Sequence, residues 1–291
     1  MSAEVVVIGE ALVDIIVRPG RGDTEYPGGS PANVALGLGR LERSVRLLTA
    51  LGDDDRGRRI RSWLADSAVE VEAHALDRTA TARATLGSDG SAQYDFDLVW
   101  DIASLSIDAD PKVVHIGSLS ALREPGAGRV RALVDRLGED TVVTYDPNVR
   151  PSLIPPREES RERVEEWVRR SMLVKVSDED LAWLYPAAPA REVAERWAGL
   201  GPELIVLTRG GDGIEVFSPD GRVREYPSPQ VEVSDTVGAG DSLMAGLVEA
   251  TLTASPGDWD LDAVAERSLR IAAITVSRPG ADPPWNSELS R

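Results

Sequence analysis

Four short apolar runs recur through the middle of the chain: Val113-Val-His-Ile-Gly117, Thr141-Val-Val-Thr-Tyr-Asp146, Met172-Leu-Val-Lys-Val176 and Leu204-Ile-Val-Leu-Thr208. Each run is rich in β-branched residues and apolar on both faces, which is typical of buried parallel strands. Strands that alternate with helices indicate right-handed βαβ units and a parallel sheet, so we predict an α/β fold. Helices are predicted between these strands, at 128–137, 158–170 and 191–200.

The same alternation continues toward both ends of the chain. Apolar runs predict strands at 4–9 and 46–52, and a late antiparallel hairpin from 214–217 and 223–226. We expect a turn at 26–31, before the first helix. The remaining helices are predicted at 32–41, 55–67, 242–253 and 261–276.

Residues 69–97 differ in character from the rest of the chain. They are rich in Ala, Thr, Gly and Asp and alternate between apolar and polar residues, and Ser88-Asp-Gly-Ser91 is a hairpin signal. We therefore expect antiparallel strands here that lie apart from the main sheet.

Composition excludes several classes of protein. The 291 residues include 49 acidic and 32 basic side chains, a formal net charge of −17, which argues against a nucleic-acid-binding protein. An anionic substrate must then be met by local positive groups. The absence of cysteine excludes disulfides and thiolate metal sites. No apolar run approaches the about 20 residues of a membrane span, so we expect a cytoplasmic protein.

The sharpest motif is Asp235-Thr-Val-Gly-Ala-Gly-Asp-Ser242, which precedes a helical pattern. Its small residues allow close approach to a ligand, and free N–H groups at a helix N-terminus attract anions. Asp241 would face whatever those amides hold, which suits a base that removes a proton while the amides stabilise charge. The alternative is that Asp241 or Ser242 only caps the helix.

Three further motifs could bind ligands. In Gly28-Gly-Ser-Pro-Ala-Asn33 the amide of Asn33 can donate and accept, as a sugar hydroxyl requires. Thr208-Arg-Gly-Gly-Asp-Gly213 follows a strand, at the usual ligand edge of an open α/β sheet. Asp146-Pro-Asn-Val-Arg150 also follows a strand and offers an arginine for phosphate. Each motif has a structural alternative: an ordinary turn, a tight turn into a hairpin, and a surface arginine.

The two histidines, His74 and His115, carry little functional signal. His115 lies inside an apolar run, so we expect a hydrogen-bonded interior residue. A nucleotide-binding dehydrogenase is disfavoured, because Ile8-Gly-Glu-Ala11 lacks the Gly-x-Gly-x-x-Gly fingerprint.

In their order along the chain, these motifs resemble the PfkB-type, ribokinase-like carbohydrate kinases. The resemblance runs from Gly9 to Pro284, and the paired-glycine and Asp146–Arg150 motifs are most similar to the fructokinase branch. It implies a three-layer αβα sandwich with a mostly parallel central sheet and a small β-sheet lid. We therefore expect one kinase domain, 1–291, with lid strands near 13–18 and 69–97.

The resemblance also implies roles for matched positions. It makes Asp241 the catalytic base, and the amides of Gly238, Ala239 and Gly240 the anion hole for the transferred phosphoryl group. Four positions would bind the sugar or the transferred phosphate: Asp14, Gly29, Asn33 and Arg150. Five would bind ATP: Lys175, Thr208, Gly210, Gly213 and Ala272.

The metal positions depart from the family pattern. Where many members carry an Asn-x-x-Glu motif that organises Mg²⁺, this chain has Ser177 and Asp180, so Asp180 is an indirect Mg²⁺ candidate. Pro284 stands where a hydroxyl can help to bind a monovalent cation such as K⁺. The other candidate ligands of that cation are Asp235, Val237, Thr275, Arg278 and Gly280.

The resemblance implies an ATP-dependent sugar kinase that uses Mg²⁺, with K⁺ as a candidate cofactor, and fructose as the expected acceptor. Ribokinase, nucleoside kinase and 2-keto-3-deoxygluconate kinase activities are alternatives. A catalytically silent sugar-binding regulator is an alternative of another class, which an intact Asp241 disfavours. The expected partners are the sugar and ATP, without nucleic acid or membrane, and a homodimer through the lid is a candidate assembly.

Overall fold

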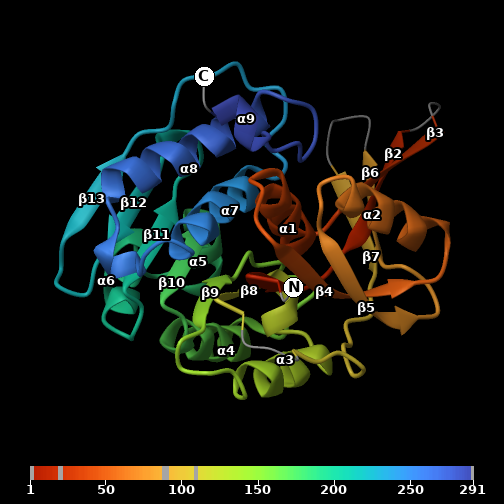
Figure 1. Ribbon diagram of the computed structural model, residues 1–291, viewed down its shortest axis with the longest axis horizontal. Coiled ribbons are helices and arrows are strands. Elements are labelled where there is room, and N and C mark those ends of the chain that lie inside the picture. The colour runs from red at the N-terminus through yellow and green to blue at the C-terminus, as the bar shows by residue number, and fades with distance from the viewer. Residues whose placement is uncertain (1–2, 19–21, 87–91, 108–110, 290–291) are drawn as a thin grey trace.

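The computed structural model describes residues 3–18, 22–86, 92–107 and 111–289, and two sheets organise them. In the larger sheet, seven neighbouring strands run parallel and a hairpin adds two antiparallel strands at one edge, which confirms the predicted α/β fold (Figure 1). Its nine strands lie in the order β13 (Val223–Tyr226), β12 (Ile214–Phe217), β11 (Leu204–Thr208), β10 (Leu173–Ser177), β9 (Val142–Asp146), β8 (Val113–Gly117), β1 (Val5–Ile8), β4 (Val45–Gly52) and β5 (Glu70–Leu76).

Helices cover both faces of this sheet and make three layers. Alternate residues of β1 show the division, because Val5 and Val7 join one apolar cluster while Val6 and Ile8 join the other. The first cluster packs under α1 (Ser30–Arg40), α2 (Asp55–Ala65), α7 (Ala239–Thr251) and α8 (Leu261–Val276). The second packs under α3 (Gly126–Val134), α4 (Arg157–Arg170), α5 (Asp178–Leu184) and α6 (Ala190–Ala198).

A short last helix, α9 (Asn286–Leu289), follows α8. Its Leu289 packs with Leu41 and Ile271 in a small third cluster. Within the described ranges, no helix has both the length and the apolar character needed to cross a membrane.

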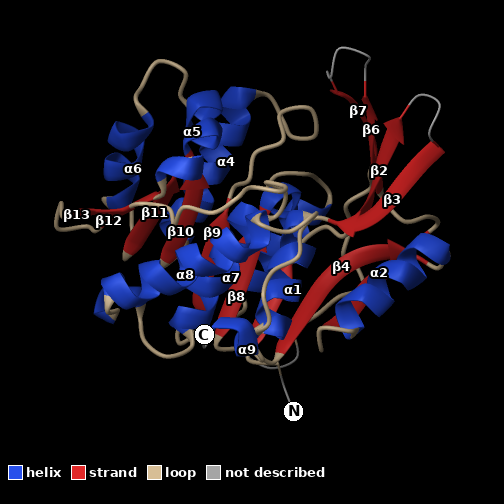
Figure 2. Ribbon diagram, turned by 90° about the horizontal axis from the view of Figure 1, so that it is seen from above, coloured by secondary structure: helices blue, strands red, loops and turns tan. Residues whose placement is uncertain are grey.

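The smaller sheet projects to one side of the larger one (Figure 2). Its four strands lie in the order β3 (Gly22–Gly28), β2 (Leu12–Arg18), β6 (Thr81–Leu86) and β7 (Ala92–Asp97). The separate sheet predicted from 13–18 and the second half of 69–97 is therefore present. The predicted hairpin turn at 88–91 lies outside the described residues.

Two predictions around this lid were wrong. Residues 70–76 form β5, which pairs parallel with β4 in the main sheet. Their alternation arises because β5 is an edge strand with exposed glutamates, not because it belongs to the lid. Tyr26–Gly28, predicted as a turn, ends β3, which is exposed along much of its length. Proline is tolerated there because β3 is an edge strand.

Candidate active site

The start of α7 lies earlier than the sequence pattern predicted. Gly238 takes the left-handed conformation at the N-cap, with φ of 77°, and α7 begins at Ala239 rather than at Ser242. Asp241 therefore lies in the first helical turn, where backbone N–H groups have no intrahelical acceptors. The N–H of Ala239 donates to the Thr236 carbonyl at 3.3 Å, a long bond that an anion could replace. The predicted anion hole, made of the amides of Gly238, Ala239 and Gly240, lies in this turn.

Asp241 points into the protein and caps nothing. No side chain caps α7, which excludes the alternative that Asp241 only begins the helix. Its carboxylate is 7% exposed and accepts hydrogen bonds from Ser30 Oγ at 2.7 Å and from Asn33 Nδ2 at 2.8 Å. Asn148 Nδ2 lies 3.5 Å from the same carboxylate. These donors hold Asp241 as an acceptor, the state that a base requires.

A buried ion pair lies against the anion hole. Lys175 on β10 donates to Asp146 Oδ2 on β9 at 2.9 Å. A Cβ added to Gly240 would lie 3.0 Å from Lys175 Nζ, so the ammonium touches the anion-hole turn. Burial alone would lower the pKa of Lys175, but Asp146 and Asp180 raise it. Burial raises the pKa of Asp146 to about 6 against the opposing effect of Lys175.

The predicted sugar positions lie where the lid joins the main sheet. Asp14 is on β2, and a Cβ on Gly28 would collide with Asp14 Oδ2 at 2.2 Å. Gly29 has φ of 106°, and a Cβ there would lie 2.5 Å from the Glu10 carbonyl, so a glycine is required at this position. Burial raises the pKa of Asp14 to about 6, while Arg150 lowers it and Asp241 raises it. Asp14 on the lid strand is thus close enough to Asp241 for their charges to interact.

The loop after β9 carries Arg150 toward the same region. Asn148 has φ of 36°, and Asp180 fixes the loop because its Oδ1 accepts the N–H of Val149 at 2.7 Å. Asp180 Oδ2 accepts the N–H of Ser177 and completes a capping box at the start of α5. Arg150 is exposed, and its Nη1 donates to the Val149 carbonyl at 3.0 Å.

The predicted ATP positions divide into two kinds. Gly210 has φ of 49° with no atom within 4 Å of an added Cβ, so its backbone faces open space after β11. Gly213 has φ of 102°, and a Cβ there would lie 2.1 Å from the Tyr226 carbonyl, which agrees with the tight-turn alternative. Thr208 ends β11, and Ala272 is half-buried in α8.

Hydrogen bonds draw the candidate cation ligands together. Asp235 Oδ1 and Oδ2 accept the N–H groups of Val237 and Gly280, each at 3.0 Å, and the Thr275 carbonyl accepts the N–H of Arg278. The Arg278 side chain pairs with Glu288 at 2.6 Å. Carboxylate and carbonyl oxygens suit a hard cation, although these oxygens already accept hydrogen bonds.

Three residues in contact with the site were not predicted as site residues: Ser30, Asp146 and Asn148. All three lie inside motifs that the sequence pointed to. The hydrogen bonds of Ser30 and Asn148 to Asp241 join segments more than 90 residues apart, and the pair of Asp146 with Lys175 joins two neighbouring strands, so spacing along the chain could not find them. His115 is interior as predicted, bonded to Thr144 Oγ1 at 3.0 Å, and burial lowers its pKa to about 3.

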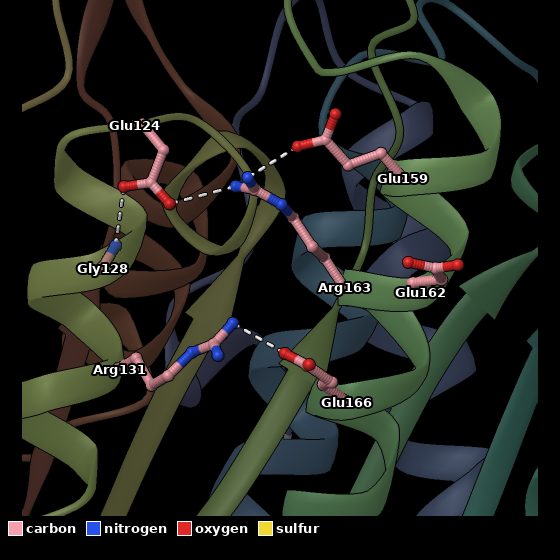
Figure 3. Close-up of a pocket in the computed structure, with 7 residues that line it drawn as sticks. All are labelled: Glu124, Gly128, Arg131, Glu159, Glu162, Arg163 and Glu166. Carbon is pink, nitrogen blue, oxygen red and sulfur yellow. Dashed lines mark hydrogen bonds and ion pairs between the residues drawn. The ribbon is translucent and has the colours of Figure 1, made fainter.

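A hollow of about 400 Å³ lies elsewhere, between α3 and α4 (Figure 3). Its side chains are mostly paired, with Arg163 bonded to Glu124 and Glu159 and Arg131 bonded to Glu166. These helices cover the sheet face opposite α1 and α7, so the hollow is separate from Asp241.

Comparison with known proteins agrees with this geometry. Residues 2–288 match the family model described as pfkB family carbohydrate kinase. Fructokinase-1 of Oryza sativa subsp. japonica is 30% identical over 99% of this chain and 96% of its own. A sugar kinase of Pyrococcus horikoshii, solved in complex with ATP, is 26% identical with a TM-score of 0.83 over 98% of this chain and 96% of its own. Aminoimidazole riboside kinase of Salmonella enterica is 25% identical with a TM-score of 0.79 over 98% and 97%.

The family model covers nearly the whole chain, and the fold agrees with that of the solved sugar kinase. The chain therefore belongs to the PfkB family of carbohydrate kinases and is an ATP-dependent sugar phosphotransferase.

Proposed function

We propose that this kinase transfers the γ-phosphate of ATP to a primary hydroxyl of fructose. The observation that carries the proposal is the carboxylate of Asp241, held by Ser30 and Asn33 in the first turn of α7 with Lys175 against the same turn. Similarity to fructokinases over almost the full chain favours fructose as the acceptor.

Asp241 would accept the proton of the attacking hydroxyl. Ser30 and Asn33 each donate to a different oxygen of its carboxylate and so restrict its orientation, and each oxygen keeps a lone pair that could accept the proton. As negative charge moves onto the transferred group, the amides of the anion hole and the ammonium of Lys175 would stabilise it. Asp146 keeps that ammonium in place, and Arg150 supplies a second cation from the loop after β9.

The sugar would be oriented by side chains on two elements. Asn33 donates a hydrogen bond from Nδ2 to Asp241. The Oδ1 atom of Asn33 is buried without a hydrogen-bond partner among the described residues. Such an orphaned acceptor is costly unless a ligand donates to it, which fits a sugar hydroxyl. Asp14 would accept further hydroxyls from the lid side.

Mg²⁺ would neutralise the phosphates of ATP. Among the described residues, no three His, Asp or Glu side chains are grouped to hold a metal. Mg²⁺ that is bound to a nucleotide keeps water and phosphate ligands, so it would need few protein groups here. Asp180 is engaged by two backbone N–H groups, so we propose that it acts by holding the loop that carries Arg150.

Similarity to a riboside kinase structure keeps ribosides as a second acceptor class. The test is ADP release with fructose, ribose, a nucleoside and 2-keto-3-deoxygluconate at equal concentration. We expect kcat/KM for fructose to exceed the others by at least about tenfold, which is about 1.4 kcal/mol of discrimination. A higher kcat/KM for ribose or a nucleoside would overturn the assignment of fructose as the acceptor and leave the kinase activity in place. If none of the four acceptors causes ADP release while the protein still binds a sugar, the result would favour the catalytically silent regulator.

A further inference from the structure

The segment that follows α8 packs directly on the anion hole. The N–H of Gly280 donates to Asp235 Oδ2 at 3.0 Å, and a Cβ added to Gly238 would lie 2.6 Å from Ala281 Cβ. Gly238 is the left-handed N-cap of α7, so its backbone direction sets where the anion-hole amides point. The position of residues 280–281 therefore fixes the geometry of the anion hole.

One side chain anchors this segment from outside the site. Arg40, the last residue of α1, donates from Nη1 to Asp282 Oδ1 and to the Pro283 carbonyl, both at 2.5 Å. Its guanidinium also stacks 5.3 Å from the ring centre of Trp285. The Arg40 side chain is only 13% exposed, and Nε is bonded to Ser67 Oγ. Three contacts from one planar group restrict the segment far more than a single surface ion pair would.

The same helix also positions the base. Ser30 and Asn33, in the first turn of α1, hold Asp241, and α1 packs so closely on α7 that a Cβ on Gly37 would lie 2.8 Å from Ala245. One buried helix thus contacts the base at its start and the support of the anion hole at its end.

We propose that Arg40 is a positioning residue for phosphoryl transfer, which acts through Asp282 and Pro283 to hold Gly238 and the anion-hole amides in register with Asp241. This inference rests on the proposed role of those amides but not on the identity of the sugar. The reaction is the phosphoryl transfer already assigned to this family. Arg40 would act on it indirectly, because it lies outside the residues proposed to bind ATP or the sugar.

The test compares Arg40→Met with Arg43→Met and Arg40→Lys. Arg43 lies just beyond the same helix and pairs with Glu249 at 2.7 Å, so its loss removes an ion pair without touching residues 280–285. Because small displacements of reacting groups can cost up to about 100-fold, we expect Arg40→Met to lower kcat roughly 5- to 30-fold. The sugar KM should stay within about twofold. Arg43→Met should keep kcat within about twofold, and Arg40→Lys should restore part of the loss.

Hydrogen exchange gives a readout that needs no turnover. In the protein without ligands, Arg40→Met should speed exchange of the amides from Thr236 to Asp241, and Arg43→Met should not. Equal kcat for Arg40→Met and the wild type, or equal exchange in both methionine variants, would overturn the proposal. An acceptor other than fructose in the ADP-release assay would leave this comparison intact, because it can be made with whichever sugar is phosphorylated.

Discussion

Asp241 is the proposed catalytic base, and its surroundings make an isosteric variant available for testing that role. In Asp241→Asn the new amide can face Ser30, whose hydroxyl can turn to accept, while the remaining oxygen keeps Asn33. The fold should therefore tolerate the change. We expect kcat to fall by roughly 10²–10⁴ with ATP and sugar affinities within a few-fold, because only proton removal is lost. Steady-state kinetics with near-normal turnover would exclude Asp241 as the base.

Arg150 is a second single-residue test. Its described hydrogen bonds go to backbone carbonyls of its own loop, so its loss should change the free energy of unfolding little. We expect Arg150→Lys to lose activity partially and Arg150→Ala severely, because a lysine keeps the charge but not the paired donors. Kinetics and thermal unfolding should be measured together. Wild-type kinetics in both variants would make Arg150 an ordinary surface residue.

Asp14 should make sugar binding sensitive to pH. Burial raises its pKa to about 6, above the ordinary 3.8, so its carboxylate is lost as pH falls through 6. A protonated carboxyl accepts sugar hydroxyls less well, so we expect the sugar KM to rise between pH 7 and pH 5. The effect of pH on the stability of the free protein has the opposite direction. Because burying the ionised carboxylate of Asp14 is costly, its contribution to the free energy of unfolding declines as pH rises from about 4 to 6.

The control for this prediction is the variant at the same position. Asp14→Ala should raise the sugar KM at pH 7 by at least about tenfold, since unpaired hydroxyls cost about 1–3 kcal/mol each, and leave the ATP KM nearly unchanged. Its sugar KM should also lose the dependence on pH. A wild-type pH profile in Asp14→Ala would assign the titration to another group, with buried Asp146 as the next to test.

Residue types and motif order pointed to Asp241 and Asn33 as site candidates, and the structure brings these two side chains together. Residue types and motif order were not enough for Ser30 or Asn148, because a hydroxyl or amide becomes functional only through the neighbour that folding supplies. For Asp180 the sequence position suggested an indirect role at the Mg²⁺ site. The structure adds a structural role that the sequence did not indicate, because its two carboxylate oxygens accept backbone N–H groups of Val149 and Ser177.

At the scale of elements, the interior was easier to predict than the edges. Strands β8 to β11 lie inside the sheet with almost every residue buried, so their apolar runs are unmistakable. Edge strands β5 and β3 bury few residues: the alternating sequence of β5 was assigned to the wrong sheet, and the polar end of β3 resembles a turn. Helix α5 was missed because it has only seven residues, and its start depends on the Ser177–Asp180 capping box.

The lid strands should respond to the sugar. Contacts of β3 with the main body run through Glu25, which pairs with Arg56 and Arg59 on α2. Strands β6 and β7 form the other side of this sheet. Because closure would exclude water from the reaction, we expect hydrogen exchange in peptides covering 81–97 to slow when fructose is added with a non-hydrolysable ATP analogue. If ribose slows this exchange and fructose does not, the acceptor would be ribose rather than fructose, and the assignment as a kinase would stand.

The whole molecule has a net charge of −17, which would repel an anionic substrate such as ATP, so cationic side chains are needed at the site itself. Lys175 is buried against the first turn of α7 and Arg150 is exposed near Asp14, so each would place a positive charge next to a bound phosphate. The carboxylates of Asp146 and Asp241 lie among these cations and offset part of that charge. Elsewhere a number of acidic residues pair with arginines, and one such network joins distant parts of the chain.

Glu249 is the centre of that network. Its buried carboxylate on α7 accepts from Arg43, beyond α1, at 2.7 Å and from Arg267 on α8 at 2.7 Å, and Arg267 also reaches Asn286 on α9. Removing the shared anion leaves two guanidinium groups side by side. Both are partly exposed, so the cost should fall below the about 3–5 kcal/mol of a fully buried pair.

We therefore expect Glu249→Gln to lower the free energy of unfolding by about 1–3 kcal/mol, measured by urea denaturation at low salt. The matched control is Glu266→Gln on α8, which makes the same chemical change at an exposed position and should stay within about 0.5 kcal/mol. Because Glu249 lies two turns from Asp241, kcat of the folded variant should remain within about twofold. Equal midpoints for the two glutamine variants would show that α1, α7, α8 and α9 are held together by their apolar contacts alone, and that the network adds nothing to stability.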